Sequence, residues 1–125
     1  MKGKILVVDD SMTARKLVVD CLLEQGCEVV EANDGKDGLA KIQENHDVNL
    51  IFSDINMPWM SGLEMVSEIK KDSSISRIPI CMLTTESGTE SVAEAKKLGV
   101  DAFLVKPVQK EQLIMILEGY LKAAG

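Results

Sequence analysis

Residues 4–8 read KILVV and lead directly into Asp9 and Asp10, and this stretch decides the fold class. A short, continuous apolar run is typical of a strand that is covered on both faces of its sheet. Similar runs recur along the chain, and amphipathic stretches with helical spacing separate them. The alternation predicts an α/β fold with a parallel sheet and right-handed crossover connections.

Five strands are predicted, with helices between them and after the last one. The strands are expected at 4–8, 28–32, 49–53, 79–84 and 102–105. Two helices are expected to bury one apolar stripe each, formed by Ala14, Leu17, Val18, Cys21 and Leu22 in the first and by Leu113, Ile116, Leu117, Tyr120 and Leu121 in the last. Ser61 with Glu64, and Ser87 with Glu90, have the spacing of capping boxes that open two further helices.

The composition, 46% hydrophobic and 27% charged over 125 residues, predicts one soluble domain that spans 1–125. No apolar run approaches the roughly 20 residues of a membrane span, and the start MKGKILVVDD turns acidic too early for a secretory signal, so we expect a cytoplasmic protein. A net charge of -6 argues against non-specific binding to nucleic acid. Cys21, Cys27 and Cys81 form no CxxC pair and are expected to be idle or buried thiols.

Polar side chains stand at the carboxyl ends of four of the predicted strands. Asp9 and Asp10 follow the first, Asp54 follows the third, Thr84 ends the fourth and Lys106 follows the fifth. Open α/β sheets bind ligands at this edge, so these groups are expected to share one site. Three close carboxylates repel one another unless they hold a cation, and oxygen ligands favour a hard ion such as Mg²⁺. Lys106 would supply a positive charge opposite the metal.

Each of these residues alone has an ordinary structural explanation. Asp9, Asp10 and Ser11 could simply cap the first helix, and an aspartate such as Asp54 often precedes a turn. The combination of acid pair, third acid, hydroxyl and lysine at one edge is much harder to explain without a shared site. We therefore interpret these residues together as a functional site.

The motifs ILVVDDS, SDINMPWMSGLE, LTTES and AFLVKP resemble those of response-regulator receiver domains over essentially the whole chain. The resemblance implies a flavodoxin-like fold with strand order 2-1-3-4-5. It also implies that Asp54 accepts a phosphoryl group with Mg²⁺ as cofactor. By the same resemblance, Asp10 and Asp54 are direct metal ligands, Asp9 acts largely through metal-bound water, and Asn56 offers its backbone carbonyl.

The resemblance further implies a conformational switch. Thr84 and Lys106 match the family's hydroxyl and lysine, and Phe103 matches the aromatic residue that changes rotamer on activation. Asn56 and Glu86 match positions that affect dephosphorylation, and this combination of residues suggests that the phosphorylated state is short-lived. A cis Lys106-Pro107 bond is also implied. Trp59 is expected to cover apolar surface beside the site.

A receiver of this kind would catalyse its own phosphorylation and dephosphorylation rather than act as a conventional enzyme. The implied partners are a sensor histidine kinase of the CheA type and a downstream target protein, for which a flagellar motor switch protein is the leading candidate. The receiver itself is expected to be a monomer. A phosphorelay intermediate and a phosphorylation-independent scaffold remain alternatives. A haloacid-dehalogenase-type phosphatase is disfavoured because such an enzyme needs a second acid at the position that Asn56 occupies. Flavin binding is disfavoured because Asp9 and Asp10 would repel the phosphate of the flavin nucleotide.

Overall fold

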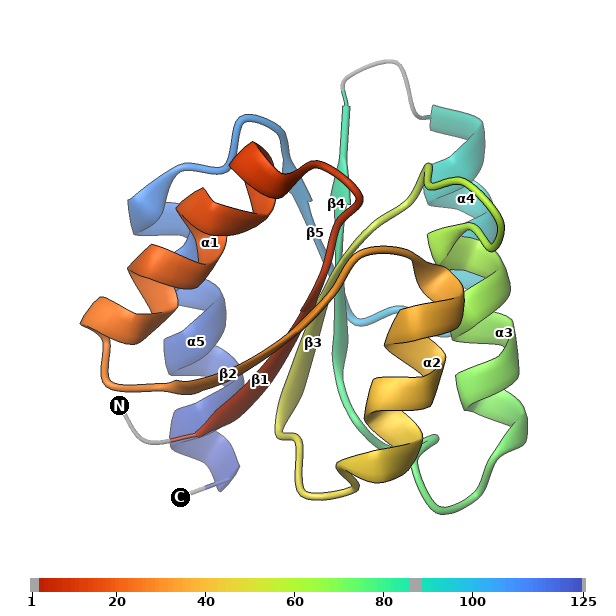
Figure 1. The fold of residues 1–125 in the computed structure, drawn as a ribbon, viewed down its shortest axis with the longest axis horizontal. Helices are drawn as coiled ribbons and strands as arrows, with labels where there is room; N and C mark the ends of the chain where they lie inside the picture. The colour runs from red at the N-terminus through yellow and green to blue at the C-terminus, as the bar shows by residue number, and fades with distance from the viewer. Residues whose placement is uncertain (1–2, 86–88, 125) are drawn as a thin grey trace.

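The computed structural model describes residues 3–85 and 89–124 and contains one parallel sheet between two layers of helices (Figure 1). The strands are β1 (Lys4–Val8), β2 (Glu28–Ala32), β3 (Leu50–Asp54), β4 (Ile80–Thr84) and β5 (Ala102–Val105). The helices are α1 (Met12–Glu24), α2 (Gly35–Glu44), α3 (Gly62–Lys71), α4 (Thr89–Lys97) and α5 (Lys110–Ala124). The strand order β2-β1-β3-β4-β5 confirms the predicted fold class and topology.

Each face of the sheet has its own apolar core, because successive strand residues point to opposite sides. Ile5 and Val7 of β1 face α1 and α5, where they pack in one cluster with Val18 and Leu117. On the other face, Leu6 and Val8 of β1 join residues of α2, α3 and α4 in a second cluster. The central strands are therefore buried on both sides, as their continuous apolar sequences indicate.

Two predicted strands differ from the observed ones by one residue. β3 runs from Leu50 to Asp54 rather than over 49–53, because Asp54 still pairs with Leu83 of β4. β4 begins at Ile80 rather than at Pro79, which has no N–H to donate although its carbonyl accepts a hydrogen bond from Ile51. Differences of this size are usual where strands end.

The predicted apolar stripe of α1 is wrong at Leu17, which is 68% exposed. The buried side of α1 is formed by Val18, Val19 and Leu22. At about 100° per residue, Leu17 is turned about 140° away from Leu22 and so points away from the sheet. In α5 the prediction is confirmed, since Leu113, Leu117 and Leu121 are buried and the other two predicted residues pack partly against them.

The predictions for the start of α3 and for the cysteines agree with the structure. Ser61 and Glu64 form the expected capping box at the start of α3. Ser87 lies outside the described residues, so the second predicted box has no described geometry. The three cysteines are free thiols, and burial raises the pKa of the Cys81 thiol to about 12.

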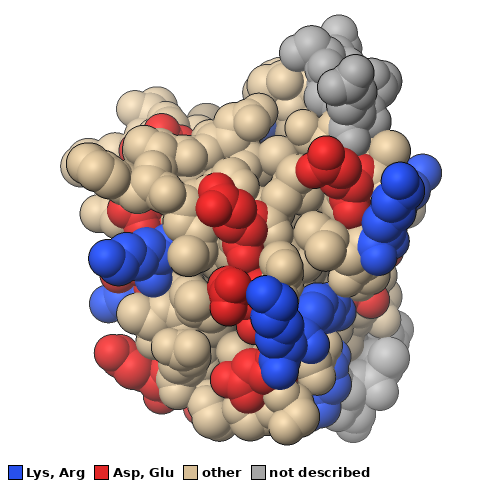
Figure 2. Space-filling model, turned by 90° about the vertical axis from the view of Figure 1, so that its right-hand side faces the viewer, with Lys and Arg blue, Asp and Glu red and all other residues tan. Residues whose placement is uncertain are grey.

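The surface on the side of α3 and α4 carries basic and acidic side chains interspersed with one another (Figure 2). Among the described residues, no helix has both the length and the apolar character needed to cross a bilayer.

The start of α3 packs directly against the chain that carries Asp54. The N–H of Gly62 donates to the carbonyl of Ile55 at 2.7 Å, and a Cβ added to Gly62 would overlap the carbonyl oxygen of Asp54. Only a residue without a side chain permits this approach. Gly62 thereby fixes the backbone immediately after the third acid of the site.

We predict that Gly62→Ala lowers the free energy of unfolding by about 1–3 kcal/mol, because the new methyl group must displace backbone in a packed region. Gly119→Ala is the matched control, since nothing lies within 4 Å of a Cβ at that position in α5. The control should be neutral or stabilising by up to about 1 kcal/mol. Urea unfolding measures both, and equal effects of the two substitutions would contradict the proposed clash.

Candidate functional site

The topology places the candidate site where the chain changes direction across the sheet. From the end of β1 the chain passes through α1 to β2 on one side, whereas β3 lies on the other side of β1. Such a switch point leaves a crevice at the carboxyl ends of the two strands. Val8 pairs with Ser53, so Asp9 and Asp54 follow neighbouring positions at this edge.

Three carboxylates meet in the crevice. One oxygen from each of Asp9, Asp10 and Asp54 lies within 4.8 Å of the other two. Asp9 is 1% exposed, Asp54 is partly buried and Asp10 is exposed, so the cluster opens to solvent on the Asp10 side. A donor set made only of oxygen fits a hard divalent ion that keeps some of its water, as Mg²⁺ does.

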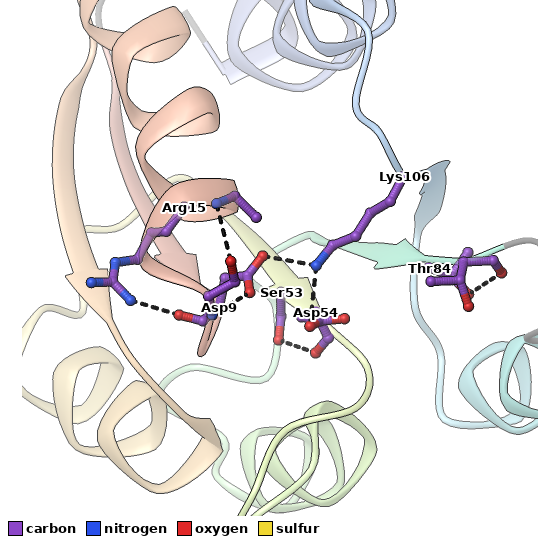
Figure 3. A network of polar contacts seen from close by, with 9 residues as sticks. Asp9, Arg15, Ser53, Asp54, Thr84 and Lys106 are labelled. Carbon is purple, nitrogen blue, oxygen red and sulfur yellow. Dashed lines mark hydrogen bonds and ion pairs between the residues drawn. The ribbon is translucent and has the colours of Figure 1, made fainter.

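Lys106 reaches from the end of β5 into the gap between the two less exposed acids (Figure 3). Its Nζ donates to Asp9 Oδ2 at 2.9 Å and lies 3.2 Å from Asp54 Oδ2. Burial tends to lower the pKa of Lys106, but the hydrogen bond with Asp9 and the charges of both aspartates outweigh it, so the pKa is raised. The lysine is therefore held as a cation between the two carboxylates.

The ionisation of Asp54 is set by opposing effects. Burial raises the pKa of its carboxyl group above the ordinary value, and the nearby charge of Asp9 acts in the same direction. The charge and hydrogen bond of Lys106 lower it but do not fully compensate. A second cation beside Asp54 would favour its ionised, nucleophilic form further.

Every polar atom of Asp9 takes part in a hydrogen bond. Its N–H donates to the carbonyl of Ala32 in β2 at 3.1 Å, and its Oδ1 accepts from the N–H of Ser11 at 2.9 Å. Its own carbonyl accepts from Nη1 of Arg15 at 2.7 Å. Together with the Lys106 contact at Oδ2, these bonds give the buried carboxylate a single defined position.

Thr84 and Phe103 share one face of the sheet, and among the described residues neither forms a hydrogen bond or ion pair with the three carboxylates. Thr84 is buried, and its hydroxyl donates to the carbonyl of Thr85 at 3.0 Å (Figure 3). Phe103 packs, partly buried, against the core cluster on the side of α2, α3 and α4. Thr84 pairs with Val105 and Met82 with Phe103, so the two side chains lie on the same side of neighbouring strands.

The remaining predicted residues have mixed outcomes. Asn56 is exposed in the loop after β3, whereas Glu86 lies outside the described residues. The Lys106-Pro107 bond is cis, as predicted. Trp59 does not cover apolar surface: it is 90% exposed, and its φ of 71° lies in the left-handed region, which is uncommon for a residue with a bulky side chain.

The sequence-based site omitted Arg15. Its guanidinium joins the Asp9 carbonyl to Glu31 Oε1, which accepts from Arg15 Nε at 3.0 Å. A signal was present in the sequence, because Arg15 precedes Val18 by three residues and Val19 by four and so occupies a core-facing position of α1. A charge at such a position needs partners, and here they are the backbone carbonyl of Asp9 and the carboxylate of Glu31.

Comparison with known proteins agrees with this geometry. Residues 5–118 match the family model described as the response regulator receiver domain. Chemotaxis protein CheY1 of Helicobacter pylori is 42% identical over 119 residues, which cover 91% of this chain and 96% of the relative. Protein PilG of Pseudomonas aeruginosa is 37% identical over 118 residues, which cover 94% of this chain and 87% of the relative.

Solved structures give the same result. Chemotaxis protein CheY4 of Vibrio cholerae, crystallised at low pH, superposes with a TM-score of 0.88 at 40% identity and covers 96% of this chain and 99% of its own. A protein of Chloroflexus aurantiacus, at 23% identity and a TM-score of 0.90, shares the fold and covers 98% of this chain. With an acid triad and a lysine at the switch point of such a sheet, the chain belongs to the family of response regulator receiver domains.

Proposed function

We propose that this chain is a signalling switch that takes a phosphoryl group from a phosphohistidine onto the carboxylate of Asp54. The observation that supports the proposal most directly is the placement of Asp54 beside Lys106 and within 4.8 Å of the acid pair. Asp54 ends a central strand and is only partly buried, so a donor can reach it. The acceptor is therefore both held in place and accessible.

In the proposed reaction, an Asp54 oxygen attacks phosphorus in line with the bond to the histidine nitrogen. The new O–P bond forms as the N–P bond breaks, and the imidazole leaves with the electron pair. The Lys106 ammonium, already between Asp9 and Asp54, neutralises charge on a phosphoryl oxygen. Positioning and charge carry most of the catalysis in such transfers.

Mg²⁺ is the proposed cofactor. Asp10 and Asp54 would hold it directly, Asp9 largely through water, and the backbone carbonyl of Asn56 would complete the protein ligands. When bound, the ion would neutralise the carboxylates and the incoming phosphoryl oxygens. The exposed side of the cluster at Asp10 leaves room for the water that Mg²⁺ retains.

The switch would begin at Thr84. Its hydroxyl now donates to the Thr85 carbonyl, so it must exchange this bond for one to the new phosphoryl group. Movement of Thr84 would open space on the sheet face that it shares with Phe103, and Phe103 would then turn inward. A local charge change would in this way become a change in the surface near β5.

The output requires partners. We propose that the phosphoryl donor is a histidine kinase of the CheA type and that the signal passes to a separate target protein. A flagellar motor switch protein is the leading candidate for this target, and the proposed location is the cytoplasm. The chain would act as a monomeric receiver over residues 1–125, with the surface of α4, β5 and α5 binding the target. The similarity to CheY proteins named for chemotaxis supports this choice.

Asp54→Asn should accept no phosphoryl group from phosphoramidate in the presence of Mg²⁺, because a neutral amide oxygen is a far weaker nucleophile than a carboxylate oxygen. Asp47→Asn is the matched control, since Asp47 is exposed before β3 and pairs with Lys4 at the opposite end of the strand. The control should be labelled at the wild-type rate. Intact-mass measurement follows both proteins. Equal labelling of the Asp54 variant would refute the assignment, whereas a wild type that takes no label would favour a phosphorylation-independent scaffold.

Asn56→Ala should lengthen the lifetime of the phosphoprotein by roughly five- to tenfold, if the amide orients the attacking water through one hydrogen bond of about 1 kcal/mol. Asn33→Ala is the control, because Asn33 is exposed at the same edge but follows the outer strand β2. Loss of label after donor removal measures the lifetime. An unchanged lifetime for Asn56→Ala would leave this residue without a role in dephosphorylation.

A further inference from the structure

Arg15 is a charged residue at a core-facing position. It lies on the same side of α1 as Val18, Val19 and Leu22, and its side chain is only 14% exposed. Burial of a guanidinium is costly unless its N–H groups and its charge are both satisfied. Two partners satisfy it here: the backbone carbonyl of Asp9 at 2.7 Å and the carboxylate of Glu31 at 3.0 Å.

The bond to the Asp9 carbonyl acts on the peptide that joins the two acids. The N–H of Asp9 is already bound to the Ala32 carbonyl, and Arg15 holds the carbonyl oxygen on the other side of the same residue. A peptide unit is planar, so fixing the Asp9 Cα and carbonyl oxygen also fixes the Cα of Asp10. Asp10 has an exposed side chain, and in the described part of the chain no hydrogen bond or ion pair holds it.

We propose that Arg15 is a positioning residue that places Asp10 for metal binding, with Glu31 holding the guanidinium in turn. Figure 3 shows Arg15 on the side of Asp9 away from Lys106, so the two basic residues hold Asp9 from opposite directions. This inference rests on the proposed function, because it concerns the affinity of the same acid cluster for Mg²⁺.

The sign of the effect separates positioning from electrostatics. Removing a positive charge near a cation site strengthens cation binding if charge alone matters. Loss of the Arg15 contact should instead weaken Mg²⁺ binding, because Asp10 would no longer be held in place. If Arg15 only connects α1 to β2, its substitution would lower thermal stability and leave the affinity for Mg²⁺ unchanged.

Isothermal titration calorimetry with Mg²⁺ alone, without any phosphodonor, tests the proposal. Arg15→Met should raise the Kd for Mg²⁺ by about tenfold, the scale found when groups that orient metal ligands are removed. Lys16→Met is the matched control: it removes the same charge one residue away, where Lys16 is exposed and pairs only with Asp20 in the described structure. Its Kd should be unchanged or slightly lower.

Glu31→Ala provides a second variant, since Glu31 is half-exposed and its loss should not prevent folding. It should raise the Kd less than Arg15→Met does, because the Arg15 bond to Asp9 can persist. The double variant should bind Mg²⁺ no more weakly than Arg15→Met alone, since Glu31 is proposed to act only through Arg15. Additive losses would overturn that arrangement.

The outcomes distinguish this inference from the proposed function. If the wild type binds Mg²⁺ and Arg15→Met binds it equally well or more tightly, the positioning role is refuted and the proposed function stands. If the wild type binds no Mg²⁺, the magnesium part of the proposed function fails and the inference fails with it. Weaker binding by Arg15→Met with normal binding by Lys16→Met supports the proposal.

Discussion

The mutual repulsion of three carboxylates within 4.8 Å is the constraint on which the rest of the site depends. Lys106 relieves part of it by lying between Asp9 and Asp54, yet burial still leaves the pKa of Asp54 above its ordinary value. One lysine against three acids leaves a net negative crevice. Such a crevice attracts a cation, and a bound cation would in turn make it able to accept an anionic phosphoryl group.

The fold supplies the rigidity that this repulsion requires. β1 and β3 are buried on both faces, so the strand ends that carry the acids cannot easily move apart. Gly62 lets α3 close against the chain after Asp54, and Arg15 holds the peptide between Asp9 and Asp10. The residues proposed to move lie further out in the sheet: Thr84 ends β4, and Phe103 belongs to the edge strand β5, where it is only partly buried.

Sequence patterns predicted the parts of the protein that follow from periodicity and chain order. Continuous apolar strands gave the sheet, and strand-end chemistry predicted that Asp9, Asp10, Asp54 and Lys106 would meet, because parallel strands end at one edge. Contacts that depend on side-chain direction were harder to predict. Leu17 was assigned to the core although it is exposed, and Arg15 was overlooked although its spacing placed it there.

The central claim is that the acid cluster directs a phosphoryl group to one carboxylate and needs Mg²⁺ to do so. The most direct measurement is peptide mapping of the wild-type protein after treatment with phosphoramidate and reduction with borohydride, which converts an acyl phosphate to an alcohol. The account predicts a single modified residue, Asp54, formed only when Mg²⁺ is present. Modification at another residue, or equal modification of Asp54 without Mg²⁺, would contradict it.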